Sequence, residues 1–316
     1  MLSESKCCPG SSHIDECACL APLSRTDYTV VPVRNRNRTR LFDMVIHRSD
    51  HDAVSRSIRT IGFWDLAHPR ELAELAGSRL PDTSHSGDGP PVFLDIGANL
   101  GFYSLLFASI GFSVFAIDPM NHNRRALNAS LCLNPPLAQR VTLINAALGA
   151  PSDAGRACTV ESIRLRNGGI GNGVLHCEHE RVRNSSTAIA AATADRTRSS
   201  DDVDLTTLDT LLLRSPYRPR QIDVVKIDIE GSECRMLEGA GGVLDHFRPK
   251  LIQWEGKLSA SDACLRRAVS SRGYRIGPRN GRDANTVAVS AAWDRHVEAH
   301  RAVGARAKGH EHATAA

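Results

Sequence analysis

The chain has 316 residues, room for one large α/β domain with extensions or for two small domains. Apolar residues make up 41% of it, enough for a sizeable core, and no apolar run is long enough to span a membrane. A net charge of +4 and an aromatic fraction of 5% give no sign of a nucleic-acid partner. Nine cysteines, an odd number, favour a reducing compartment over a disulfide-based scaffold.

Residues 1–40 lack apolar periodicity, and we expect a poorly ordered N-terminal segment. The segment has no basic stretch followed by an apolar core, so it does not resemble a secretory signal. We therefore expect a cytoplasmic protein. The cysteines and histidines of this segment lack the paired spacing of a zinc site, and we predict no bound metal.

The pattern turns helical between residues 42 and 80. Asp52 is predicted to cap a helix that ends at Gly62, and Pro69 suits the first turn of another. Helices placed before the first strand of an α/β sheet can cover a ligand bound at its edge, so we expect an N-terminal helical lid. Phe63 and Trp64 are candidate lid residues, with a place in the core as the alternative.

The most informative stretch runs from Val92 to Pro119. It contains an apolar strand, a glycine-rich turn, an apolar helix and a second strand, which is the βαβ unit of a doubly wound nucleotide-binding sheet. The amides of such a turn sit at the positive end of the helix, close to the ligand. The residues predicted to bind the ligand here are Asp95, Gly97, Asn99, Gly101, Phe102 and Asp118.

The spacing of this turn distinguishes between ligands. A dinucleotide site has Gly-x-Gly-x-x-Gly, whereas Asp95 here stands two residues before the first glycine. Its carboxylate would repel a pyrophosphate but suits the ammonium of S-adenosylmethionine (SAM), and Asp118 is placed to accept both ribose hydroxyls. We therefore predict SAM as the cofactor. The alternatives are NAD and a turn that only packs a helix on a strand.

Weaker patterns follow. Residues 141–144 are predicted as the third strand, and Asn145 and Ala146 at its end are placed to reach the adenine. Between residues 151 and 204 the periodicity degrades, and a hairpin of 157–165 with 173–175 is predicted there. Residues 205–213 are predicted to be helical.

Residues 222–229 have the composition of a buried strand, yet Lys226, Asp228 and Glu230 alternate onto one face at its end. Buried charges are costly unless they are paired or functional. The carboxyl end of such a strand is where open α/β sheets bind ligands. Asp228 is therefore a candidate catalytic group, with a structural Lys226–Asp228 pair as the alternative.

The remaining elements complete one domain. A strand over residues 250–254 ends at Glu255, a helix is predicted over 261–271, and two late strands around Arg275 and 286–289 suit an antiparallel edge hairpin. We expect the domain to span residues 41–290, followed by a C-terminal tail of residues 291–316.

These segments resemble the FkbM-type family of SAM-dependent methyltransferases. The resemblance runs from residue 42 to 289 and rests on LDIGANLGFYSL, FAIDP, NAALG, LTTLDTLL and, most specifically, VVKIDIEGSECRMLEGA. It implies an α/β fold with a doubly wound, Rossmann-like class I methyltransferase sheet. It also implies methyl transfer to oxygen, commonly a hydroxyl of a sugar or secondary metabolite. Asp118 stands where the family often has glutamate, which keeps the ribose contact.

Methyl transfer to an alcohol needs in-line alignment and a base that takes the hydroxyl proton. Asp228 is the first candidate, held ionised by Lys226, and Glu230 and Glu255 are the next carboxylates along the rim. These three carboxylates are also hard ligands of the kind that bind a metal assisting the acceptor. We expect a small-molecule or glycan acceptor, with neither nucleic acid nor membrane as a partner. The alternative to an enzyme is a non-catalytic protein that keeps the SAM pocket.

Overall fold

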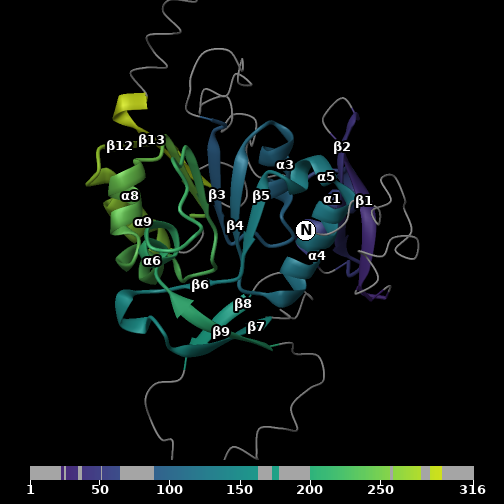
Figure 1. The fold of residues 1–316 in the computed structure, drawn as a ribbon, viewed down its shortest axis with the longest axis horizontal. Helices are drawn as coiled ribbons and strands as arrows, with labels where there is room; N and C mark the ends of the chain where they lie inside the picture. The colour runs from purple at the N-terminus through teal and green to yellow at the C-terminus, as the bar shows by residue number, and fades with distance from the viewer. Residues whose placement is uncertain are drawn as a thin grey trace, which may run out of the picture.

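The centre of the molecule is a seven-stranded mixed sheet with the order β12-β13-β11-β10-β3-β4-β5 (Figure 1). The computed structural model describes residues 23–24, 26–34, 38–50, 52–64, 89–162, 173–177, 200–256, 259–278 and 285–293. The strands of the sheet are β3 (Val92–Ile96), β4 (Ser113–Ile117), β5 (Val141–Ile144), β10 (Val224–Ile227), β11 (Leu251–Trp254), β12 (Tyr274–Ile276) and β13 (Thr286–Ser290).

The direction of the strands confirms the predicted fold class. The five strands from β11 to β5 run parallel, and β13 is antiparallel to both β11 and β12. This is the class I methyltransferase sheet with its antiparallel edge hairpin. Strand order reverses between β3 and β10, so the carboxyl ends of these two strands form the point where open α/β sheets bind ligands.

Helices cover both faces of the sheet (Figure 1). Apolar residues alternate along the strands, so that Phe93 packs into one core and Leu94 into the other. The first face carries α3 (Phe102–Ser109), α4 (Asn121–Leu133) and α5 (Pro135–Ala138). The second carries α6 (Leu208–Leu213), α7 (Glu233–Glu238), α8 (Gly241–Phe247) and α9 (Ser259–Ser270).

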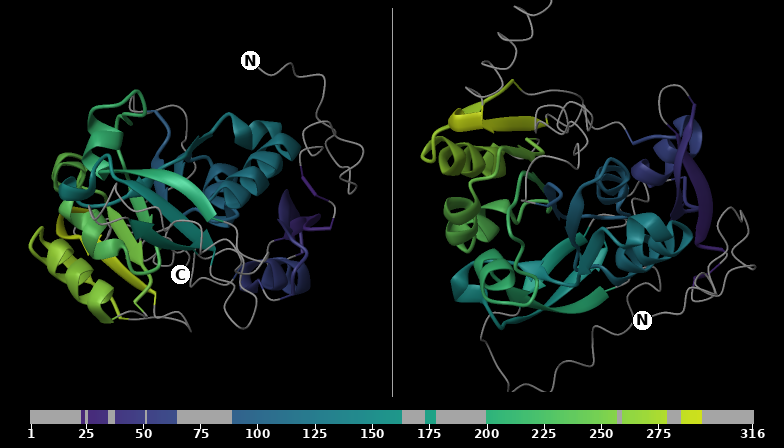
Figure 2. Two further views of the ribbon diagram at one scale, coloured as in Figure 1. Left: turned by 90° about the horizontal axis from the view of Figure 1, so that it is seen from below. Right: turned by 45° about the horizontal axis from the view of Figure 1, so that its top comes forward.

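A hairpin and one helix lie outside the first helical layer. Strands β1 (Tyr28–Arg34) and β2 (Arg40–His47) are antiparallel and pack with α1 (Ala53–Ile61) against α3 and α4, at the edge of the molecule in both views of Figure 2. Side chains of the helices reach the backbone of β2. The amides of Asp43, Val45 and His47 donate to Asn134 Oδ1, Ser130 Oγ and Ser55 Oγ, at 2.9–3.1 Å.

The hairpin corrects two expectations. Residues 28–34, expected to be poorly ordered, form a strand with Tyr28 and Val33 buried, and residues 40–47 form a strand where the pattern favoured a helix. The predicted helix caps are confirmed: Asp52 accepts from the amide of Ser55, and Gly62 ends α1 with a φ of 77°. Residues 65–88, with the second expected helix, and 294–316 of the expected tail lie outside the described residues.

Phe63 and Trp64 were expected either in a lid or in the core, and the structure places them in the core. Both pack against the first core, and the ring of Phe63 lies edge-on to Phe102 with 5.0 Å between ring centroids. The described part of residues 41–64 therefore supports the helical layer and contributes no residue to the pocket described below.

A second, four-stranded sheet lies below the main sheet in Figure 1, with the order β6-β9-β7-β8. The predicted hairpin is confirmed as the antiparallel pair β7–β8, whereas Leu205, predicted to be helical, lies in β9. The strands are β6 (Ala147–Leu148), β7 (Ala157–Ser162), β8 (Gly173–Cys177) and β9 (Ser200–Thr206). A short 3-10 helix, η3 (Pro151–Asp153), connects β6 to β7.

The odd number of cysteines led us to expect a reducing compartment, but two disulfide bonds join described residues. Cys158 of β7 is bonded to Cys177 of β8, and Cys234 of α7 is bonded to Cys264 of α9. Among the helices of the described segments, none has both the length and the apolar character that a membrane crossing needs.

Candidate active site

The glycine-rich turn after β3 is held between the two neighbouring strands. The amides of Gly97 and Ala98 donate to the carbonyl of Ile117, at the end of β4. On the other side, a Cβ atom on Gly97 would lie 1.8 Å from the carbonyl oxygen of Asp228, and its φ of 79° also disfavours a side chain. Only glycine allows this approach, so the turn brings the ends of β4 and β10 to one place.

A pocket opens at this place. Its lining comes from the ends of β3, β4, β5 and β10 and from the second sheet. The lining residues are Ile96, Gly97, Asn99, Ile117, Asp118, Pro119, Met120, Ala146, Ala147, Leu148, Val160, Gly173, Leu175, Asp228, Ile229, Glu230 and Ser232.

Asp118 is fixed in the wall of the pocket by its own backbone surroundings. One carboxylate oxygen accepts from the amide of Asn99 and the other from the amide of Met120, both at 2.8 Å. Burial raises its pKa to about 6, although these hydrogen bonds oppose the shift. The oxygen that accepts from Met120 also accepts a longer hydrogen bond, of 3.5 Å, from Asn123 Nδ2. The oxygen bound to the amide of Asn99 has a second lone pair, so the ionised group retains acceptor capacity for a ligand hydroxyl.

Lys226 joins the glycine turn to the strand that carries Asp228. Its buried ammonium donates to the carbonyl of Gly97 at 2.9 Å and lies 3.5 Å from Asp95 Oδ1 and 3.4 Å from Asp228 Oδ2. Burial alone would lower the pKa of Lys226, but Asp228 and Asp95 beside it raise the pKa above its ordinary value. The amine is therefore charged, and it fixes both carboxylates relative to the turn.

Asp95 does not lie in the pocket wall. Its side chain has no exposed surface, and it accepts a hydrogen bond from Ser104 Oγ at 2.6 Å while its other oxygen faces Lys226. Burial raises its pKa, and Lys226 and Ser104 oppose that shift. This position behind the turn differs from the predicted contact with a ligand ammonium, because β10 lies beside β3 and brings Lys226 to Asp95.

Three carboxylates gather at the β10 end of the pocket. Asp228, whose side chain is 30% exposed, and Glu230 line the pocket. Glu255 follows β11, and one oxygen from each of the three lies within 4.8 Å of the others. The structure therefore brings the three predicted carboxylates together, with Lys226 buried beside Asp228.

Glu233 was not singled out from the sequence, although it shapes this end of the pocket. One oxygen of its buried carboxylate accepts from the amides of Ile229 and Gly231, both at 3.2 Å, and the other accepts from Ser261 Oγ at 2.5 Å. The turn that it holds includes Glu230 and Gly231, both with positive φ. A glutamate two residues after a glycine, at the start of a helix, was the available signal.

The predicted cofactor residues divide into two groups. Gly97, Asn99, Asp118 and Ala146 line the pocket. The others support it or lie beside it: the φ of Gly101 is 84°, Phe102 is in the first core, and neither these two nor Asn145 is part of the lining. The lining from Val160, Gly173 and Leu175 had no sequence signal, because a weakly periodic hairpin does not indicate which surface it covers.

Comparison with known proteins now identifies the family. A family model described as the methyltransferase FkbM domain matches residues 95–276, more than half of the chain. The chain belongs to the FkbM methyltransferase family. It is therefore a SAM-dependent methyltransferase. No curated protein matches the sequence.

Solved structures of other methyltransferases are similar to this FkbM domain at low identity. The METTL16 MTase domain is 14% identical with a TM-score of 0.43, over 81% of this chain and 85% of that one. Precorrin-6y C5,15-methyltransferase from Geobacter metallireducens GS-15 is 12% identical with a TM-score of 0.37, over 73% and 96%. The human methyltransferase 10 domain containing protein is 11% identical with a TM-score of 0.39, over 71% and 80%.

The pocket of this FkbM domain fits SAM. A buried acceptor, Asp118, is available for the ribose hydroxyls, and the apolar residues beyond it suit the faces of a purine. The turn at Gly97 and the carboxylates of Asp228 and Glu230 line the part of the pocket next to β10. The lining beside Asp118 would hold the nucleoside.

Proposed function

We propose that this protein transfers the methyl group of SAM to a hydroxyl oxygen of a small molecule or glycan, with Asp228 as the base. The observation that carries the proposal is the partly exposed carboxylate of Asp228 in the pocket wall, 3.4 Å from the buried ammonium of Lys226. Lys226 lies behind the wall, so it orients this carboxylate without itself occupying the place of the acceptor.

The proposed reaction forms no covalent intermediate with the protein. Bound SAM supplies an electrophilic methyl group on a sulfonium. Asp228 accepts the hydroxyl proton of the acceptor as the new carbon–oxygen bond forms, and the sulfur keeps the electron pair of the bond that breaks. A positioned base contributes roughly 10²- to 10⁴-fold in such a step. The products are a methyl ether and S-adenosylhomocysteine (SAH).

Replacing Asp228 tests the role of the base. Asp228→Asn keeps the shape of the side chain, and we expect single-turnover methyl transfer to fall by at least ~10²-fold while SAH affinity changes by less than about threefold. The matched control is Glu238→Gln, which removes an exposed carboxylate on α7 outside the pocket lining. A stable Asp228→Asn protein with near-native turnover would exclude this base.

The same variant also separates the catalytic role from a structural one. If Asp228 serves only to neutralise Lys226, its loss leaves that ammonium with Asp95 alone, and the melting temperature falls while turnover per folded molecule is retained. Melting temperature and turnover are therefore measured on one preparation.

The nature of the acceptor atom can be determined without knowing the natural substrate. SAM with a ¹³C-labelled methyl group is incubated with panels of glycosides, phenols and amines, and the carbon chemical shift distinguishes methoxy from N-methyl products. Transfer to hydroxyl compounds supports the proposal, and transfer only to amines contradicts it. SAH binding without transfer to any compound supports the non-catalytic alternative.

The cellular compartment and partners stay predictions. The cytoplasmic placement expected from the sequence is opposed by the Cys158–Cys177 and Cys234–Cys264 disulfide bonds, because disulfides persist in oxidising compartments. Mass spectrometry of protein whose free thiols were blocked in the cell decides this point: labelled Cys158 and Cys177 support a reducing compartment, and protected ones contradict it. A small-molecule or glycan acceptor is part of the proposal above.

A further inference from the structure

The wall of the pocket formed by β7 and β8 is the feature that the class I sheet does not explain. Val160 of β7 and Leu175 of β8 are opposite each other in the strand pair, and both line the pocket. Gly173 completes this wall, and a Cβ atom on it would lie 2.6 Å from Val160 and 2.8 Å from Met120. The wall therefore stands against Met120, two residues beyond Asp118.

A disulfide bond closes the same strand pair. Cys158 and Cys177 are paired in the ladder two residues before Val160 and two residues after Leu175, so they lie on the same face as those two residues. Cys158, Val160 and Met120 belong to one small apolar core, and Leu175 and Cys177 pack against it. The bond is thus continuous with the surface that faces the pocket.

Among the described strands, β8 has a single partner. It is five residues long and lies at the edge of the four-stranded sheet, where β7 is its one neighbouring strand. A short edge strand with one partner is marginal on its own. The disulfide adds a covalent link between β8 and β7, and so fixes Leu175 against the pocket.

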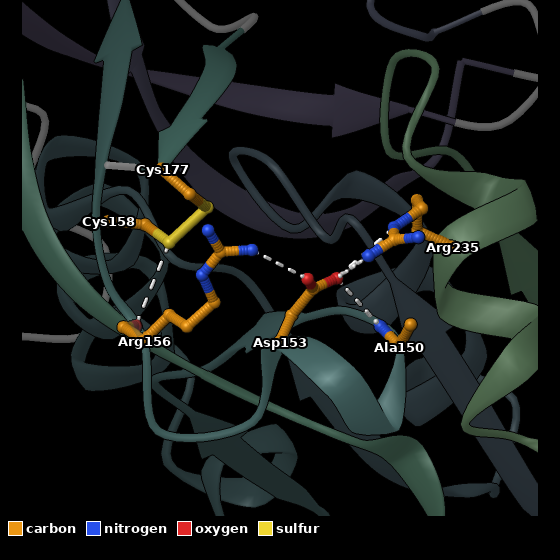
Figure 3. The surroundings of a disulfide bond; sticks show 6 residues. All are labelled: Ala150, Asp153, Arg156, Cys158, Cys177 and Arg235. Atoms are coloured by element: carbon orange, nitrogen blue, oxygen red, sulfur yellow. Dashed lines mark hydrogen bonds and ion pairs between the residues drawn. A yellow bond between two sulfur atoms is a disulfide. The ribbon is translucent and has the colours of Figure 1, made fainter. Parts of the chain in front are cut away.

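Strand β7 is anchored in turn to the helix that follows the Asp228 turn. Arg156, just before β7, lies 3.1 Å from Asp153, and the same carboxylate accepts from Nε of Arg235 on α7 at 3.1 Å (Figure 3). The hydrogen bond from Arg235 holds the pKa of Asp153 below its ordinary value. Because β7 is fixed at this end, the disulfide determines how firmly β8 completes the wall.

We infer that the β7–β8 pair, pinned by the Cys158–Cys177 disulfide, encloses the nucleoside half of the bound cofactor and that opening this disulfide weakens cofactor binding. The inference rests on the proposed SAM site. The wall adjoins Met120 and Ala147, which follow β4 and β5, so it covers the side of the pocket next to Asp118. An apolar surface beside a ribose acceptor suits the face of a purine.

Titration calorimetry with SAH and with 5′-methylthioadenosine, which lacks the amino-acid part, tests this placement. We expect Leu175→Ala to weaken both ligands by about tenfold, since apolar contact is lost from the nucleoside. Equal affinity within twofold in this variant, or a loss for SAH alone, would overturn the inference. If neither ligand binds the unaltered protein, the proposed function itself is wrong.

The disulfide is tested with a matched pair of double variants. Cys158→Ala/Cys177→Ala is expected to weaken both ligands by about fivefold, because the side chains of the wall must be ordered on binding. Cys234→Ala/Cys264→Ala removes the disulfide between α7 and α9 instead, and is expected to bind as tightly as the unaltered protein. Circular dichroism and melting temperature show that each variant is folded.

A dithiol reductant provides the last arm of the test. It passes two electrons and two protons to a protein disulfide, leaving two thiols, and becomes a cyclic disulfide. We expect it to weaken SAH binding by about fivefold in the unaltered protein and in the Cys234/Cys264 variant, and not in the Cys158/Cys177 variant. An equal effect in all three, or none in any, would contradict the inference.

Discussion

The two sides of the pocket differ in what holds them. On the β10 side, Asp228 is tied through Lys226 to Asp95 and to the backbone of Gly97, all within the central sheet. On the β5 side, Ala147, Val160 and Leu175 belong to a smaller apolar sheet closed by a disulfide. The charged side suits chemistry, which needs a carboxylate held in one place. The apolar side suits binding of a nucleoside, which needs a surface that fits it.

The largest effect on the pocket is expected from a side chain added at Gly97, in the turn between β4 and β10. We expect Gly97→Val to abolish SAH binding, a loss of about 4 kcal/mol or more, since its Cβ would overlap the carbonyl of Asp228. Gly273→Val is the control, because Gly273 has a similar φ of 78° with no atom near the added Cβ. Calorimetry that shows tight binding by Gly97→Val would mean that this turn is not the cofactor site.

The next test isolates the β10 side. Lys226→Met leaves Asp95 and Asp228 without their shared cation, and we expect the free energy of unfolding to fall by about 3–5 kcal/mol. Lys250→Met is the control: that ammonium lies 2.8 Å from Asp223 but is 34% exposed, and its loss is expected to cost about 1 kcal/mol. Equal losses of unfolding free energy in the Lys226 and Lys250 variants, measured by urea unfolding, would show that the buried ion pairs of Lys226 do not stabilise the β10 side more than an exposed pair does.

The third test concerns Asp118, on the side of the nucleoside. We expect Asp118→Ala to weaken SAH binding by about 2–4 kcal/mol, since charged hydrogen bonds to the ribose are lost. The unaltered protein is expected to bind 2′-deoxy SAH more weakly than SAH by calorimetry. Equal affinity for the two ligands would exclude the ribose contact.

The pH dependence of Asp118 sharpens the same test. Its pKa is about 6 in the fold, above the ordinary value of an aspartate, so folding favours the protonated form and stability falls as pH rises from about 4 to about 6. Ribose hydroxyls need the ionised acceptor, so SAH affinity is expected to rise over the same window and level off above it. Asp118→Asn is expected to remove both dependences, as measured by thermal unfolding and calorimetry.

The difference between the two sides also explains what could be predicted from the sequence. The strand, turn and helix around Gly97 follow from local patterns, and so does the strand bearing Lys226 and Asp228, because residues that define them are adjacent in sequence. The place of Asp95 could not be predicted in this way. Its partner Lys226 reaches it only because β10 lies beside β3 in the sheet.

The apolar side of the pocket was the harder part to predict. The hairpin over residues 157–177 shows as a weak pattern, but its contact with Met120 and its disulfide depend on pairing between distant segments. The N-terminal hairpin was missed for a similar reason: α4 side chains stabilise β2 from about 90 residues away.

The hydrogen bonds that β2 amides donate to side chains of α4, its C-cap and α1 also affect how copies of this protein meet. A strand at the edge of a sheet exposes a row of amides that can pair with a strand of another molecule. In β2 the amides of Asp43, Val45 and His47 already donate to Asn134, Ser130 and Ser55. Short polar side chains on α4, its C-cap residue and α1 thus occupy these amides of β2, so this edge does not offer them to a strand of another molecule.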